Sequence, residues 1–287
     1  MSKRIIIKSI YNQKVGTYMI YKKIQLDAGD ENVYLEAYIA DKVGEFVRDA
    51  ILVIPGGGYY GVCSDREGEP IAMAFMPHGY NAFVLHYSVA RKKTFPAQLI
   101  EASKAMKHIK DHADEYNINS DRVFVTGFSA GGHLAASLGT MWDMKEIYDE
   151  VEMPFGYNKP AGMILVYPVI SGVHYPHFGS FQNLLGKDNP EKEELERVSI
   201  ENHVSEKSSP LFAVHTSNDE AVDVRNSLTL ANAYREHGLT FEMHIYPDSP
   251  HGIALANNIT SVGYCEKYNN KHMAKWVDEA CEWAEKI

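Results

Sequence analysis

Cysteine is scarce in this 287-residue sequence, which has three: Cys63, Cys265 and Cys281. Because they are odd in number and widely spaced, they indicate neither a disulfide framework nor a CxxC metal site. Long hydrophobic runs are also missing. No stretch approaches the roughly 18 apolar residues of a membrane span, and residues 1–10 hold a run of only three isoleucines, too short for the core of a signal peptide. We therefore expect a cytoplasmic protein with no membrane partner.

Positive charge is in short supply too. The 28 lysines and arginines against 38 aspartates and glutamates give a formal net charge of −10. This balance argues against non-specific nucleic-acid binding, which needs basic residues to displace counterions. Repeats and low-complexity tracts are missing, and the 45% hydrophobic and 23% charged residues are ordinary for a globular protein.

The strand pattern changes along the chain. Residues 17–26 and 33–39 are rich in Tyr, Ile and Val around the turn signal 28–32, which predicts an antiparallel hairpin. From residue 50 onward, short continuous apolar runs are typical of strands buried on both faces of a parallel sheet. These runs are Ala50–Ile54, Ala82–His86, Val123–Thr126, Met163–Tyr167, Leu211–His215 and Phe241–Tyr246.

Helical segments alternate with these strands. The spacing of apolar residues predicts helices over 98–116, 227–237 and 273–284. Strand–helix alternation predicts one α/β domain over residues 1–287, a mainly parallel sheet with helices on both faces and the hairpin at one edge. Residues 171–209 do not fit the alternation. Since they follow the carboxyl end of a strand, we expect either a small lid over the ligand face or a plain surface insertion.

A candidate nucleophile follows the strand at 122–126. The sequence Gly127-Phe128-Ser129-Ala130-Gly131 is G-x-S-x-G, and an Ala-rich helical segment comes next. Such a turn pushes the serine hydroxyl out of the sheet, and the helix aims its amino-terminal dipole at the site. The pattern predicts Ser129 as a nucleophile; the alternative is an inert serine in a Gly-rich turn.

A serine nucleophile needs a base and an acid, expected in the chain order Ser, acid, His. Asp219 falls just past the strand 211–215, and His251 lies in the loop past the strand 241–246. Both places are at the carboxyl edge of the sheet, where ligand sites of open α/β folds lie. Three other carboxylates compete with Asp219 for the acid role: Glu220, Asp223 and Asp248.

Other histidines fit catalysis or metal binding less well. His215 lies within a strand, which favours a core position. His108 and His112 have the spacing of a zinc pair on a helix, but the HExxH pattern is not met. The sequence therefore predicts no metal.

A glycine-rich loop, Pro55-Gly56-Gly57-Gly58-Tyr59-Tyr60, follows the strand at 51–54. Three glycines let backbone amides approach a ligand closely, as an oxyanion hole requires. Tyr59 and Tyr60 follow directly, and we expect at least one of them to border the site and bind substrate.

The same loop also spells the dinucleotide pattern GxGxxG. That site would need a helix at once and an acidic residue near the end of the next strand. Residues 63–70 instead look like a charged loop, and 82–89 ends without Asp or Glu. No cofactor is therefore predicted.

The order of GGG loop, GFSAGG elbow, Asp after HTSN and His in PHG resembles the α/β-hydrolase esterase/lipase family. It is most similar to small esterases with a PGGGY oxyanion loop, grouped with acetyl xylan and other carbohydrate acetyl esterases. Residues 66–70, REGEP, add to the resemblance. Pro55 stands where HGGG relatives have a histidine that often braces the loop.

The resemblance implies Ser129 as nucleophile, His251 as general base and then acid, and Asp219 as the residue that orients the imidazole. The amides of Gly57, Gly58 and Ala130 would form the oxyanion hole. The implied reaction is ester hydrolysis through an acyl-enzyme, with a short acyl group such as acetate on a saccharide. A peptidase, an arylformamidase or a non-catalytic carbohydrate-binding protein are the alternatives, and a homo-oligomer stays open.

Overall fold

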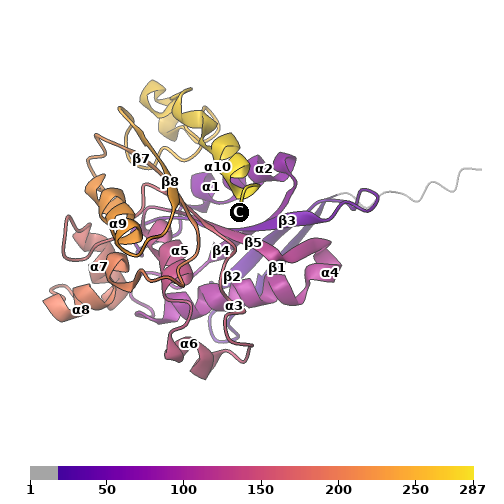
Figure 1. Ribbon diagram of the computed structural model, residues 1–287, viewed down its shortest axis with the longest axis horizontal. Coiled ribbons are helices and arrows are strands. Elements are labelled where there is room, and N and C mark those ends of the chain that lie inside the picture. The colour runs from indigo at the N-terminus through magenta and orange to yellow at the C-terminus, as the bar shows by residue number, and fades with distance from the viewer. Residues whose placement is uncertain (1–18) are drawn as a thin grey trace, which may run out of the picture.

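Eight strands between residues 20 and 246 form one sheet in the computed structural model, which describes residues 19–287 (Figure 1). Residues 17–18 of the predicted hairpin and the segment considered for a signal peptide lie outside the described residues. The strand order is β1-β2-β4-β3-β5-β6-β7-β8. The strands are β1 (Ile20–Gln25), β2 (Tyr34–Ile39), β3 (Arg48–Ile54), β4 (Tyr80–His86), β5 (Ile118–Phe128), β6 (Met163–Val166), β7 (Leu211–Thr216) and β8 (Phe241–Tyr246).

The sheet is mixed in the predicted way. β1 pairs antiparallel with β2, and β2 pairs antiparallel with β4. The remaining strands are parallel to one another; they are β4, β3, β5, β6, β7 and β8 in sheet order. The predicted α/β-hydrolase architecture, a parallel sheet with an antiparallel hairpin at one edge, is confirmed.

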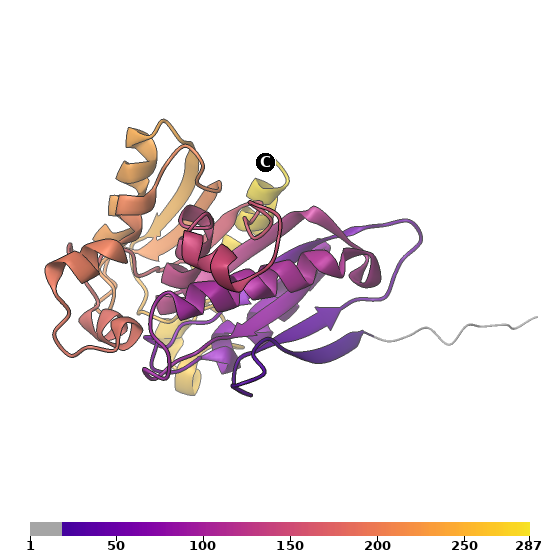
Figure 2. The same cartoon turned by 90° about the horizontal axis from the view of Figure 1, so that it is seen from below.

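Helices cover both faces of the sheet, and each face has its own core. α3, α5 and α9 lie over one face and α2 and α10 over the other (Figures 1 and 2). Their apolar side chains belong to two separate core clusters. The α-helices are α1 (Ser64–Glu67), α2 (Glu69–Phe75), α3 (Ala97–Asp111), α4 (Ala113–Tyr116), α5 (Ala130–Thr140), α6 (Lys145–Glu150), α7 (Phe178–Leu185), α8 (Lys192–Arg197), α9 (Arg225–Glu236) and α10 (Trp276–Ala284). Short 3₁₀ turns are η1 (Met76–His78), η2 (Ile200–His203), η3 (Val262–Tyr264), η4 (Glu266–Tyr268) and η5 (Met273–Lys275).

Two local predictions need correction. Residues 63–70 are not a charged loop, because α1 and the start of α2 occupy them. Pro70 sits in the first turn of α2, where a missing N–H costs nothing. The predicted helix over 98–116 is two helices, α3 and α4, which meet at His112.

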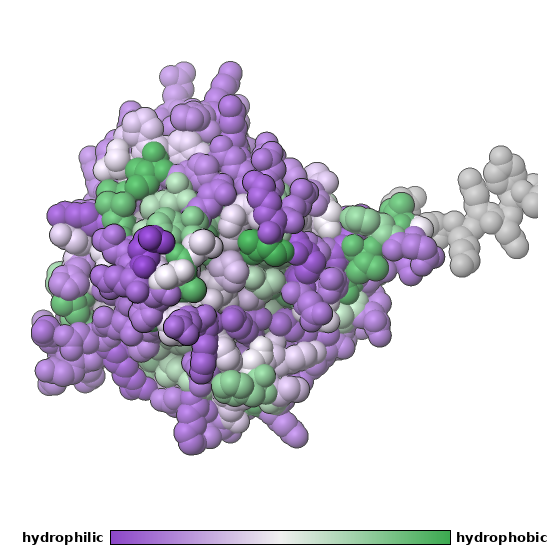
Figure 3. All heavy atoms as spheres, in the orientation of Figure 1, coloured by the Kyte–Doolittle hydropathy of each residue, from purple (hydrophilic) through white to green (hydrophobic). Residues whose placement is uncertain are grey.

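The insertion at 171–209 contains α7, α8 and η2, and lies at one end of the molecule in Figure 2. On the face drawn in Figure 3, hydrophilic side chains predominate and apolar ones form separate patches. None of the helices within residues 19–287 combines the length and the apolar character needed to cross a lipid bilayer.

Candidate active site

Ser129 sits at a sharp turn between β5 and α5. Its φ of 52° and ψ of −120° lie in a region that residues with a side chain rarely adopt. The turn is held by close packing, since a Cβ on Gly131 would lie 2.2 Å from the carbonyl oxygen of Ile54. Only glycine permits this approach, which brings the start of α5 against the end of β3.

Three side chains from separate loops form one hydrogen-bonded series. Nε2 of His251 lies 2.9 Å from Oγ of Ser129, and Nδ1 of His251 lies 2.7 Å from Oδ2 of Asp219. The three residues follow the carboxyl ends of β5, β7 and β8. In this arrangement His251 can accept the serine proton while Asp219 fixes the ring orientation.

Asp219 is held as an anion by its surroundings. Its side chain is fully buried, and burial alone would raise its pKa. Hydrogen bonds with His215 and His251, together with the backbone amide of Val222, hold the pKa of Asp219 well below its usual range. Oδ1 accepts the amides of Ala221 and Val222 at 2.9 Å each.

The competing carboxylates face elsewhere. Asp248 Oδ1 accepts a hydrogen bond from Asn218 Nδ2 at 2.6 Å, and Asp223 pairs with Arg225. Glu220 is exposed. The structure therefore brings Asp219, of the four candidates, to His251.

The other histidines considered as catalytic or metal-binding residues contact neighbouring residues of the fold. His215 is buried, with Nδ1 2.7 Å from Ser227 Oγ and Nε2 2.9 Å from the carbonyl oxygen of Val222. The rings of His108 and His112 stack with centroids 4.0 Å apart. Within residues 19–287, no three His, Cys, Asp or Glu side chains are grouped so as to hold a metal ion.

The glycine loop lies directly against the elbow. A Cβ on Gly56 would lie 3.0 Å from the Cβ of Ser129. Gly57 and Gly58 have φ values of 127° and 64°, so the loop turns its backbone through conformations that favour glycine. Among the backbone hydrogen bonds of the described residues outside regular helices and strands, the amides of Gly57, Gly58 and Ala130 donate none. They are therefore candidates for the predicted oxyanion hole.

Buried Glu67, for which the sequence predicted no role, holds this loop. Its Oε2 accepts the amide of Gly56 at 2.8 Å, and its Oε1 accepts the hydroxyl of Tyr167 at 3.0 Å. The same hydroxyl accepts the amide of Ala254 at 2.9 Å. The Tyr167 ring lies 4.9 Å from that of His251, edge to face. Glu67 and Tyr167 thus connect the glycine loop with the histidine loop.

Burial raises the pKa of Glu67, while Arg66 and these hydrogen bonds act in the opposite direction. Only the REGEP resemblance pointed toward this glutamate. Pro55 stands where HGGG relatives have a histidine that often braces the loop. Here the Tyr87 hydroxyl holds this position by donating to the Pro55 carbonyl oxygen at 2.8 Å.

The two tyrosines after the glycines have different places. Tyr59 is only 2% exposed, and its hydroxyl lies 2.8 Å from Nδ1 of His133. Its side chain therefore packs in the core and is not open to a ligand, contrary to a substrate-binding role. Tyr60 is 74% exposed and free to meet a substrate.

The insertion is fastened to the glycine loop. Asn183 of α7 donates to the Gly58 carbonyl oxygen at 2.9 Å. Buried His133, whose pKa burial lowers to about 4, lies with Nε2 2.7 Å from the carbonyl oxygen of Val198. Since His133 also contacts Tyr59, residues 171–209 are attached near the glycine loop at two points, and their role as a lid stays a prediction.

Comparisons with known proteins identify a family and several similar proteins. A family model described as BD-FAE matches residues 35–234. The chain is 40% identical over 215 residues to endo-1,4-β-xylanase B of Butyrivibrio fibrisolvens, over 74% of this chain and 33% of that protein. It is 31% identical over 211 residues to the acetylxylan esterase of Xylanibacter ruminicola, over 72% of this chain and 41% of that protein. The chain therefore spans less than half of either relative.

Solved structures match over nearly the whole chain. An acetyl ester-xyloside bifunctional hydrolase from Caldicellulosiruptor lactoaceticus is similar with a TM-score of 0.80 and 33% identity, over 93% of this chain and 96% of that one. A carboxylesterase from Lactobacillus plantarum is similar with a TM-score of 0.79 and 25% identity, over 94% and 98%.

Proposed function

This chain belongs to the BD-FAE family of α/β-hydrolases, and from that premise we propose that it is a serine esterase for short acyl esters, acetyl above all, on sugars or oligosaccharides. The observation that carries the proposal is the hydrogen-bonded series Ser129–His251–Asp219. The names of the relatives, an acetylxylan esterase and an acetyl ester-xyloside hydrolase, support the choice of substrate.

The proposed reaction has two steps. His251 Nε2 takes the Ser129 proton as Oγ attacks the ester carbonyl, and Asp219 stabilises the imidazolium that forms. The carbonyl oxygen gains negative charge, which the amides of Gly57, Gly58 and Ala130 would stabilise by donating hydrogen bonds to it. His251 then gives its proton to the departing sugar oxygen and leaves an acyl-serine. Water attacks the acyl-serine by the same route and releases the acid.

The experiment is a substrate panel with wild type and Ser129→Ala. We expect hydrolysis of acetylated xylo- and manno-oligosaccharides, and of p-nitrophenyl acetate in preference to the octanoate. Ser129→Ala should lose about 10⁴-fold or more in kcat. A preference for octanoate would remove the short-acyl proposal, and near-wild-type activity of Ser129→Ala would remove Ser129 from the mechanism. Turnover of peptides or aryl formamides instead of esters would favour the alternative reactions.

A further inference from the structure

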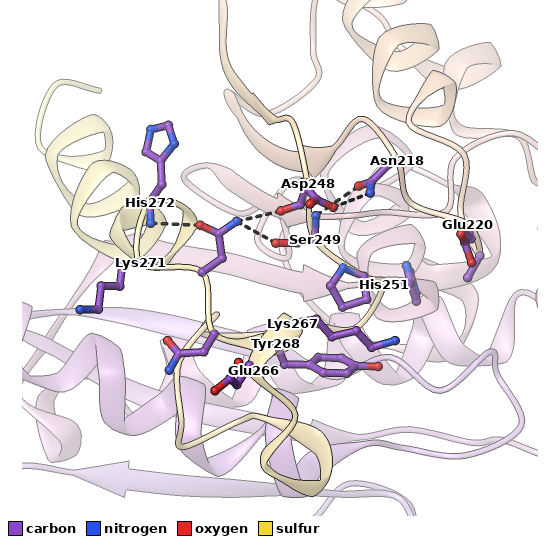
Figure 4. A pocket seen from close by; sticks show the side chains of 14 residues that line it. Asn218, Glu220, Asp248, Ser249, His251, Glu266, Lys267, Tyr268, Lys271 and His272 are labelled. Atoms are coloured by element: carbon purple, nitrogen blue, oxygen red, sulfur yellow. Dashed lines mark hydrogen bonds between the residues drawn. The ribbon is translucent and has the colours of Figure 1, made fainter.

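A polar hollow of about 820 Å³ has His251 in its wall (Figure 4). The loops after β7 and β8 form one side, with Asn218 and Asp248, and residues 266–272 form the other. Figure 4 shows Lys267 and Tyr268 extending from the second side toward the end of the hollow where His251 lies. The hollow therefore adjoins the catalytic series directly.

We propose that this hollow binds the saccharide that leaves when the ester is cleaved. The inference rests on the proposed function. In that mechanism the departing oxygen receives its proton from His251, so the sugar must lie on the His251 side of Ser129. A volume of about 820 Å³ is in the range of sites that enclose a ligand much larger than acetate. The ligand class is a neutral oligosaccharide of more than one ring.

The polar groups along the hollow are fixed in place. Asn270 Nδ2 donates to the Asp248 carbonyl oxygen at 2.8 Å and lies 2.9 Å from Ser249 Oγ. Asn218 donates to the Asp248 carboxylate at 2.6 Å and accepts the Ser249 amide at 3.1 Å. Groups held by such bonds lose little freedom when they meet sugar hydroxyls, which lowers the cost of binding.

Tyr268 gives the hollow an aromatic surface. It is partly buried and packs against the core cluster to which α2 and α10 contribute, so its ring is held while part of it stays accessible. An aromatic ring offers a sugar a flat apolar face next to polar groups. The charges nearby are of both signs, three carboxylates (Glu220, Asp248 and Glu266) and two lysines (Lys267 and Lys271). Mixed charge of this kind suits a neutral ligand better than an ionic one.

The test compares two acetyl esters with different leaving groups, acetylated xylotriose and p-nitrophenyl acetate. Tyr268→Leu keeps an apolar side chain for the core and removes the ring. We expect it to lower kcat/KM for acetylated xylotriose about tenfold more than for p-nitrophenyl acetate, mainly through KM. The matched control is Tyr21→Leu, on the edge strand β1, which is 53% exposed and should leave the ratio unchanged. Equal losses on both substrates, or no loss, would overturn the inference.

A binding measurement separates this inference from the proposed function. Titration calorimetry of Ser129→Ala with unacetylated xylotriose needs no turnover. Binding that weakens about tenfold in the Ser129→Ala/Tyr268→Leu double variant supports the saccharide site. Absence of binding to Ser129→Ala overturns it, even if the wild type cleaves acetylated sugars. Conversely, if the wild type cleaves p-nitrophenyl acetate but no sugar ester, the substrate given under the proposed function is wrong. The calorimetric result for xylotriose still decides whether the hollow binds a saccharide.

Discussion

The buried carboxylate of Glu67 should matter to catalysis although it is remote from the bond that breaks. It accepts the Gly56 amide and the Tyr167 hydroxyl at 2.8 and 3.0 Å, and it is 2% exposed. Glu67→Gln keeps the shape of the side chain but makes one of its two acceptor positions a donor. Either the Gly56 amide or the Tyr167 hydroxyl then loses its acceptor.

The size of the effect follows from these contacts. A buried donor without an acceptor costs about 1–3 kcal/mol, and bonds to a charged acceptor lie toward the upper end. If the strain appears in the glycine loop, the oxyanion amides move away from their positions. Since about 1.4 kcal/mol corresponds to a factor of ten in rate, we expect kcat/KM of Glu67→Gln to fall about 10- to 100-fold.

The assay is kcat/KM for p-nitrophenyl acetate, with urea unfolding measured alongside. Glu69→Gln is the matched control, because this glutamate is two residues away and exposed. Tyr167→Phe removes the other end of the link, so the double variant should lose less than the sum of the two single losses in free energy. Wild-type kcat/KM in Glu67→Gln, or strict additivity in the double variant, would refute the reasoning.

Three further outcomes are expected. Asp219→Asn should lower kcat for p-nitrophenyl acetate by about 10³- to 10⁴-fold, since the amide stabilises the wrong tautomer of His251; a loss below tenfold would contradict this. His133, with its pKa lowered to about 4 by burial, stays neutral in the folded state and takes up a proton more readily when unfolded. Stability from His133 is therefore full above pH 6.5 and falls with pH toward 4, by about 2 kcal/mol between pH 7 and 5. Urea titrations should show that His133→Gln loses this share of the pH dependence, and an unchanged dependence would argue against it. Gly131→Ala should give little folded protein by circular dichroism, because its Cβ would meet the Ile54 carbonyl oxygen at 2.2 Å; a normal thermal unfolding curve would contradict that packing.

The parts of the fold and site that the sequence predicts are those with a local signal. Continuous apolar runs marked the parallel strands, and G-x-S-x-G marked the turn at Ser129. Asp219 and His251 could be predicted because each follows the end of such a run. In an α/β sheet these ends meet at one edge, so chain position alone brings the residues together.

Features that depend on packing between distant segments were not predictable in this way. Glu67 is a buried acceptor only because the Gly56 amide and the Tyr167 hydroxyl reach it from elsewhere in the chain. Tyr59 looked like a site residue from its place after the glycines. Its side chain turns inward because His133 offers a buried partner, which no pattern near Tyr59 discloses.

The fastening of the insertion to the glycine loop also bears on how this scaffold can be altered. Asn183 of α7 bonds to the loop directly, and Val198, which follows α8, is connected to it through His133 and Tyr59. A chimera that exchanges residues 171–209 for those of a relative would therefore disturb the glycine loop, whose amides we propose as the oxyanion hole, unless it carries matching partners for both attachments. The insertion and the oxyanion loop form a single engineering unit, and new specificity is more safely sought in residues 266–272.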